Sequence, residues 1–430
     1  MSINLNSWPL RWTLSVTLCL QPFAGLCAPT FYGEDFIRFG ASWEEGGERW
    51  QELAGATPGP AEAKPYMKQL EALELRDGPY ADGLAEPLAA LGRYYRRQGE
   101  YQEAVNLYRR AMHVVRINDG LYSDRQIPLL RELLVSYREA GDLKSLDQRY
   151  DYFFRLYGGG QPPFTELRLR AAREYFRWQR EALRRDVGKN SRRLLDLINA
   201  NEELLLGLQQ DVEVDYLWRR EMAFSQLKNL YLLLQRHSPL LQESQVLTAS
   251  QYMGAKPAVA ELEEQRMNSL LRSAPAKGAD LLKQLMSAAR MRGPAEHASV
   301  ELALGDWYLW CGSKQRSSEA YAAVVAELQG AGESGLLEQW LGTPVELPDN
   351  GVFWVPQLIG VDEGPVVRAS YDVSSRGRLS QLQTTLISGS EDTSLNSFRR
   401  KLSAVLFRPR WVNGEPEAVT GLQRDYQILN

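Results

Sequence analysis

The most constraining stretch of the sequence is residues 88–111, LAALGRYYRRQGEYQEAVNLYRRA. Its apolar and small residues recur at spacings of three and four on both sides of a glycine-centred break, as paired amphipathic helices require. They are Leu88, Leu91, Gly92 and Tyr95 before the break at 99–101, and Ala104, Tyr108 and Ala111 after it. The pattern predicts a helical hairpin in which Gly92 and Ala104 allow close approach and the two tyrosines fill the space beside them.

Two further stretches repeat this pattern in the same phase. They are Leu130, Leu133, Leu134, Tyr137, Gly141, Leu146, Tyr150 and Phe153, and then Leu304, Gly305, Tyr308, Gly312, Ser317, Tyr321 and Val324. In the second hairpin Leu134 and Leu146 stand where the first has Gly92 and Ala104, so we expect looser packing there. Three stacked hairpins reach the number at which a continuous core forms.

The hairpins resemble the tetratricopeptide repeat (TPR), whose period is about 34 residues. The first hairpin departs from the family pattern only at its end, where Arg116 replaces a proline. Gly99 and Gly141 are 42 residues apart, which suggests an insertion of about eight residues around 118–124. Residues 164–298 have helical patterns with weaker repetition, including two helices predicted to be split at Pro275. The resemblance implies an α-solenoid over residues 65–341 that binds protein partners.

The N-terminus has the features of an export signal. Arg11 precedes an apolar run of roughly nine residues, too short for a membrane-spanning helix. We predict a signal peptide over residues 1–28, with an uncleaved anchor or a lipoprotein at Cys27 as alternatives. Outside this segment only Cys311 remains, so no intrachain disulfide is expected. Residues 29–64 are expected to form an irregular N-terminal cover with at most one short helix.

The composition changes after residue 341. Four prolines indicate a stiff linker over residues 342–364. Residues 365–430 then alternate as two strands (366–373 and 379–387), one amphipathic helix (394–406) and a last strand (418–429). We therefore predict a mainly α protein: a TPR-like solenoid of hairpins followed by a small α+β domain of order β-β-α-β.

The C-terminal domain resembles that of the TonB family. The similar parts are the turn 376–378, the pair Phe407-Arg-Pro409, the turn 413–416 and the ending Gln423-Arg-Asp-Tyr426. The resemblance implies a periplasmic location and pairing of the last strand and its neighbours with partners such as outer-membrane receptors. A long Pro/Lys-rich spacer behind a membrane anchor is missing, and so is a Tyr-Pro pair ahead of the domain. Both departures favour an adaptor over an energy-transducing component, which remains the alternative.

Catalysis has little support in the sequence. The three histidines, His113, His237 and His297, have no second ligand at metal-binding spacing, and no nucleophile elbow or phosphate loop is present. We predict no enzymatic activity, no cofactor and no metal site. A structure placing His237 or His297 beside a carboxylate and a nucleophile in one cleft would revive a hydrolase.

An arginine stripe follows Pro163. It comprises Arg170, Arg173, Arg177, Arg180 and Arg184, spaced on one helix face. It could bind an anionic partner, but Glu174 and Glu181 lie four residues after Arg170 and Arg177, so a solvated face with local ion pairs is favoured. The net charge of -4 and the export signal also argue against nucleic acid.

A second set of arginines comes from the TPR resemblance, which places the first helix of each hairpin on the concave face. The matching residues are Arg93, Arg96, Arg97, Arg131 and Arg138. Because arginine binds carboxylates bidentately, they predict a groove for an acidic protein segment or a peptide C-terminus; the alternative is solubilising surface charge. The partner is expected to be a protein or peptide, with envelope proteins among the candidates, and membrane contact is expected only through an uncleaved N-terminus.

Overall fold

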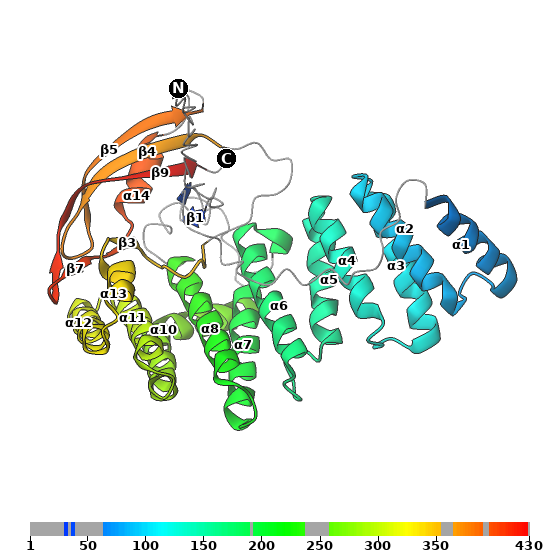
Figure 1. Cartoon of the computed structure of the whole chain (residues 1–430), viewed down its shortest axis with the longest axis horizontal. Helices are drawn as coiled ribbons and strands as arrows, with labels where there is room; N and C mark the ends of the chain where they lie inside the picture. The colour runs from blue at the N-terminus through cyan, green and yellow to red at the C-terminus, as the bar shows by residue number, and fades with distance from the viewer. Residues whose placement is uncertain are drawn as a thin grey trace, which may run out of the picture.

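The computed structural model describes residues 30–32, 36–38, 63–189, 192–236, 258–353, 364–389 and 395–428. The predicted signal peptide and His237 lie outside these residues. The described chain is a row of helical hairpins that ends in a small β-rich module (Figure 1). The predicted fold class, a TPR-like α-solenoid followed by a small α+β domain, is confirmed.

The helices follow one another in a regular order. They are α1 (Ala63–Asp77), α2 (Ala85–Arg97), α3 (Tyr101–Asp119), α4 (Gln126–Glu139), α5 (Leu143–Leu156), α6 (Glu166–Arg184), α7 (Arg193–Gln210), α8 (Tyr216–Arg236), α10 (Ala258–Arg290), α11 (Pro294–Trp310), α12 (Lys314–Ala331) and α13 (Ser334–Leu341). The three hairpins found in the sequence are α2–α3, α4–α5 and α11–α12. We call α2, α4, α6, α8 and α11 the first helices, and the side of the array that they line the first-helix face.

Glycine is required inside two of these hairpins. A Cβ atom on Gly92 would lie 2.8 Å from ring carbons of Tyr108, and one on Gly305 would lie 2.6 Å from the ring of Tyr321. Carbon atoms at such distances overlap, so only glycine lets the second helix's tyrosine cross the first helix. The close approach predicted at Gly92 is present, and the last hairpin repeats it.

The helix pair predicted to break at Pro275 is a single helix. α10 runs from Ala258 to Arg290 with Pro275 inside it. Proline removes one helical hydrogen bond and usually kinks or ends a helix, but packing holds this one: the Trp307 indole NH donates to the Pro275 carbonyl oxygen at 2.9 Å. Gly278 leaves room for the same indole ring, because any Cβ there would overlap it. Tertiary contact outweighs the local preference.

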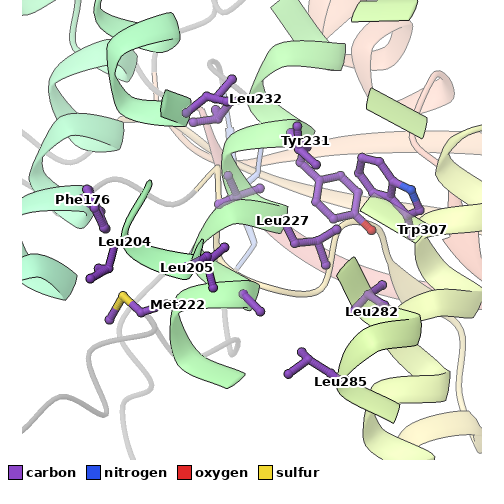
Figure 2. Packing of buried hydrophobic residues seen from close by; sticks show 14 of the residues in the cluster. Phe176, Leu204, Leu205, Met222, Leu227, Tyr231, Leu232, Leu282, Leu285 and Trp307 are labelled. Atoms are coloured by element: carbon purple, nitrogen blue, oxygen red, sulfur yellow. The ribbon is translucent and has the colours of Figure 1, made fainter. Parts of the chain in front are cut away.

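The largest apolar core lies in the middle of the array. It joins α6, α7, α8, α10 and α11, with Tyr231 and Trp307 meeting edge to face at 4.8 Å between ring centroids (Figure 2). α8 is buried on all sides from Ser225 to Leu233. This continuous core is what stacked hairpins need in place of a globular centre.

The C-terminal module contains the predicted β-β-α-β order with additions. Its elements are β3 (Val345–Glu346), β4 (Val366–Val373), β5 (Leu379–Ser388), α14 (Leu395–Ser403), β6 (Phe407–Arg408), β7 (Arg410–Val412), β8 (Glu415–Glu417) and β9 (Val419–Ile428). The main sheet has the order β1 (Thr30–Tyr32), β2 (Phe36–Arg38), β9, β4 and β5, and β4 pairs antiparallel with both β5 and β9. α14 covers it through Phe398 and Leu402, which pack in one cluster with Val367 and Tyr426.

Regular structure also occurs in the stretch expected to be an irregular cover. β1 (Thr30–Tyr32) and β2 (Phe36–Arg38) form a hairpin whose second strand pairs with β9, Ile37 opposite Gln427. This hairpin was not predicted, because three-residue strands are too short for alternation to be read. Residues 63 and 64, at the end of the same stretch, already belong to α1.

The described part of the predicted linker is also built into the fold. β3 pairs with β6, and Leu347 is buried in a core shared with α11, α12 and α13. Glu346 is buried and accepts hydrogen bonds from Arg424 at 2.7 Å and from the Tyr426 hydroxyl at 2.8 Å. Residues 345–347 therefore attach the module to the array, although the prolines around them suggested a spacer.

Candidate partner-binding surface

The five predicted arginines lie on first helices, but most face carboxylates or hydroxyls of the same chain. Arg93 donates to Glu86 at 2.9 Å, and Arg131 donates to the Tyr157 hydroxyl at 3.2 Å. Arg97 is exposed. Most of the arginines predicted to line the groove are thus already in contact with groups of the same chain.

The other two arginines join neighbouring repeats. Arg96 on α2 lies 3.3 Å from Glu132 and from Glu139 of α4. Arg138 on α4 donates two bonds of 2.9 Å to Glu181 of α6, in a bidentate pair. The bonds from Arg96 to Glu139 and from Arg138 to Glu181 each span 43 residues. The carboxylate that the sequence assigned to an external ligand is here supplied by the next hairpin.

Tyrosines of the second helices add to the same pattern. The hydroxyl of Tyr108 donates to Glu132, and that of Tyr150 donates to Glu174, each at 3.2 Å and each across 24 residues. Burial and the neighbouring carboxylates raise the pKa of both phenols far above the ordinary value, so both remain protonated donors. We call Arg96, Arg138, Tyr108 and Tyr150, with the glutamates they bind, the arginine seam.

The arginines of the seam repeat at the same 42-residue distance that separates Gly99 from Gly141. Arg96, Arg138 and Arg180 lie on α2, α4 and α6 and follow one another at steps of 42 residues. The extra residues predicted around 118–124 fall at the end of α3 and in the turn before α4. Part of the extra length is the second helix itself, since α3 has 19 residues and α5 has 14.

Arg180 ends the series with neutral partners. It is buried and donates to the Ser225 hydroxyl at 2.9 Å and to the Asn229 side-chain oxygen at 3.1 Å, both on α8. Burial lowers the pKa of Arg180 to about 9. Neutral oxygen atoms of α8 thus hold the position that Glu139 and Glu181 hold in the preceding repeats.

The five arginines of the α6 stripe are buried or half-buried rather than solvated. Arg170 binds Glu166, and Glu181 binds Arg138 and Arg185. Burial alone would raise the pKa of Glu181, but Arg138 and Arg185 outweigh it and hold this pKa below the ordinary value. The stripe forms the contact between α6 and its neighbouring first helices, because stacking brings those helices over it.

A turn of the chain itself, residues 349–353, lies against the first-helix face. Val352 and Phe353 are buried, Phe353 to 2% exposure. The Arg184 guanidinium lies 5.1 Å above the Phe353 ring and donates to the Phe353 carbonyl oxygen at 3.4 Å. Trp310 of α11 also contacts this ring, 6.1 Å away between centroids. This contact was not predicted, since Phe353 was placed in a spacer.

No catalytic cluster is evident among the described residues. His297 contacts Glu327 through Nδ1 at 2.6 Å, and both side chains belong to the packed pair α11–α12. His113 meets Tyr80 edge to face. In the described part of the chain no group of three His, Cys, Asp or Glu side chains could hold a metal ion. Likewise, none of its helices combines the length and the apolarity needed to cross a membrane.

Comparisons with known proteins give structural likeness alone. No family model matches the sequence, and no curated protein matches it. Among solved structures, the TPR-like repeats of a putative kinesin light chain from Podosopora anserina match with 12% identity and a TM-score of 0.36. The match covers 58% of this chain and 98% of that chain. A single-residue variant of the same protein gives 12% identity and a TM-score of 0.35, covering 57% and 95%.

Proposed function

We propose that this protein is an exported scaffold that binds a protein or peptide partner through the first-helix face of its TPR-like array. The observation that carries the proposal is the buried position of Val352 and Phe353 against the first-helix face. A non-helical turn is held there by an aromatic side chain and by a backbone carbonyl bound to Arg184. A face that holds one non-helical segment through such contacts has groups that can bind a peptide in the same way.

The exposed residues for a partner lie toward the N-terminal end of this face. Arg97 is exposed on α2, and Val135 is 41% exposed on α4 between Arg131 and Arg138. Because the arginine seam neutralises much of the local charge, we expect the partner to be recognised by apolar contact and by Arg97 more than by a broad cationic field. Acidic partners remain part of the proposal.

The proposed setting is the periplasm, with the C-terminal module acting as a TonB-like element of an adaptor. Support comes from the signal peptide predicted at the N-terminus and from the order β4-β5-α14-β9. The alternative, an energy-transducing transport component, requires an arm that moves freely. It has less support, because Arg408 of the module is bound to Asp306 of the array by two bonds of 2.8 and 2.5 Å.

The test is photo-crosslinking in intact cells, with a benzophenone amino acid at Val135 and, as matched control, at Ile117. Ile117 is another exposed β-branched residue, 51% exposed on the second helix α3. We expect a discrete partner band from position 135 that position 117 does not give, and its loss when Arg93→Ala and Arg97→Ala are combined. Equal products from the two positions would contradict the proposal.

Localisation is tested separately. N-terminal sequencing of the mature protein should show removal of residues 1–28 or of a slightly shorter segment. A full-length protein retained in the inner membrane with a motor complex would instead favour the transport alternative.

A further inference from the structure

The described sheet that contains the main strands of the C-terminal module has two edge strands, β1 and β5. In the order β1-β2-β9-β4-β5, the last strand β9 lies inside the sheet, paired with β2 and with β4. The TonB resemblance would assign partner pairing to that last strand and its neighbours. In this chain a strand that joins the module's side of the described sheet has to join β5.

β5 has neither the charges nor the prolines that protect many edge strands, although it is bulged in two places. Edge strands are commonly blocked by charged side chains, prolines or bulges. The ten residues of β5, LSQLQTTLIS, contain no charge and no proline. Two bulges interrupt its pairing with β4, one at residues 381–382, where Gln381 has a φ of 53°, and one at Ile387. Between them, from Gln383 to Leu386, the pairing with β4 is continuous, which leaves a regular edge of four residues on the outer side.

The surroundings of this edge are basic. Between Arg376 and Lys401 the sequence carries five basic and two acidic residues. Arg399 of α14 donates to the Thr384 hydroxyl at 2.7 Å, so its guanidinium lies beside the middle of β5. Arg376, Arg378 and Arg400 are exposed. An uncharged strand edge with cations along it complements an extended segment that carries carboxylates.

A second copy of the chain fits this edge poorly. Two β5 strands paired about a two-fold axis near Thr384 would bring two Arg399 side chains close together. Like charges facing each other across strands are destabilising. The charge pattern therefore favours a different, acidic partner.

We propose that β5 binds an extended acidic segment of another protein, which joins the sheet as a further strand and turns its carboxylates toward Arg399 and Arg400. This surface is separate from the first-helix face, so the proposal goes beyond the function proposed above. Crosslinking at Val135 and binding at β5 can fail independently.

The experiment uses the full chain and two synthetic decapeptides with the same alternating valine and threonine centre, one flanked by glutamates and one by lysines. Amide hydrogen exchange of residues 382–388 is followed during each titration. At a peptide concentration about ten times Kd, the glutamate peptide should slow exchange in β5 about tenfold, since exchange then needs release of the peptide. The lysine peptide should leave exchange unchanged.

A charge-reversed variant tests the assignment to α14. Arg399→Glu combined with Arg400→Glu should abolish protection by the glutamate peptide and allow protection by the lysine peptide. The matched control reverses two exposed cations on second helices, Arg109→Glu with Lys144→Glu, and should bind as the wild type does. Absence of protection in β5, equal protection by both peptides, or a dimer of the chain joined through β5 would each overturn the proposal.

Discussion

The first and last hairpins use one internal design and differ in what lies beside them. In both, a glycine of the first helix lets a tyrosine of the second pack across it, Gly92 with Tyr108 and Gly305 with Tyr321. Tyr108 then donates to Glu132 of the next repeat. Tyr321 donates instead to Asp306 of its own hairpin, at 2.8 Å, and Asp306 is bound by Arg408 of the module.

This difference shows how the array ends. A terminal hairpin has no following repeat to bury its outer side, which is why solenoids need capping elements. Here the short α13 and the module take that place: Trp411 packs edge to face on Tyr321, and Arg408 also donates to the Trp340 carbonyl oxygen at 3.0 Å. The module is therefore part of the array's stability as well as a candidate binding element.

The largest effect is expected at this junction. Asp306 and Arg408 are 9% and 4% exposed at their side chains. Arg408→Ala would leave a buried carboxylate without its main partner, and such losses cost about 3–5 kcal/mol. Chemical denaturation should show it. As control, Arg368→Ala breaks an exposed pair with Asp425 and should cost no more than about 1 kcal/mol; equal costs would refute the capping role.

A smaller loss is expected in the arginine seam. Glu181 is nearly buried between Arg138 and Arg185. Its pKa is lower in the folded chain than in the unfolded chain, so the stability it contributes is present above the unfolded pKa of about 4.3 and disappears as pH falls through the folded value. Glu181→Gln should destabilise the array at neutral pH by roughly 2–4 kcal/mol and flatten the pH dependence of stability below about pH 4.3. Unfolding titrations between acidic and neutral pH measure both; an unchanged pH profile would contradict this.

The shared internal design is tested by the two glycines. Gly92→Ala and Gly305→Ala should each cost about 1–3 kcal/mol, because the added methyl group overlaps a tyrosine ring. Gly330→Ala in α12 is the control: nothing lies within 4 Å of the new Cβ, so the better helix propensity of alanine should raise stability by up to about 1 kcal/mol. Thermal unfolding distinguishes the two outcomes. If Gly92→Ala left the stability unchanged, the two helices of the hairpin could move apart to accept the methyl group without loss of stability.

The smallest difference concerns the tyrosine hydroxyls. Tyr321→Phe removes a buried hydrogen bond to a charged group, worth about 1.5–3 kcal/mol, whereas Tyr108→Phe removes a longer bond at 3.2 Å and should cost about 1 kcal/mol. Denaturant midpoints of the two variants provide the comparison. If Tyr108→Phe lowers stability more than Tyr321→Phe does, the arginine seam contributes more to the stability of the array than the contact between its last hairpin and the C-terminal module.

Much of the architecture could be predicted because it is local. The three hairpins, the strands at 366–373 and 379–387 and the helix before Phe407 follow from residue spacing, and the glycine and tyrosine positions follow from the same spacing. The arginines were placed on the correct helices. Their partners could not be predicted, because Glu139 and Glu181 lie 43 residues away and become neighbours only when the hairpins stack.

The sequence by itself determined the repeated unit: which residues form each hairpin, where the helices give way to strands, and which positions must be small. Only the tertiary structure decided how charge and backbone are used between units. Because the hairpins stack, Arg96 and Arg138 bind carboxylates of the same chain. Because Trp307 packs on α10 and donates to the Pro275 carbonyl oxygen, the helix continues past the proline. Because β2 pairs with β9, the last strand lies inside the sheet. These outcomes depend on contacts between residues far apart in the chain, which local patterns do not encode.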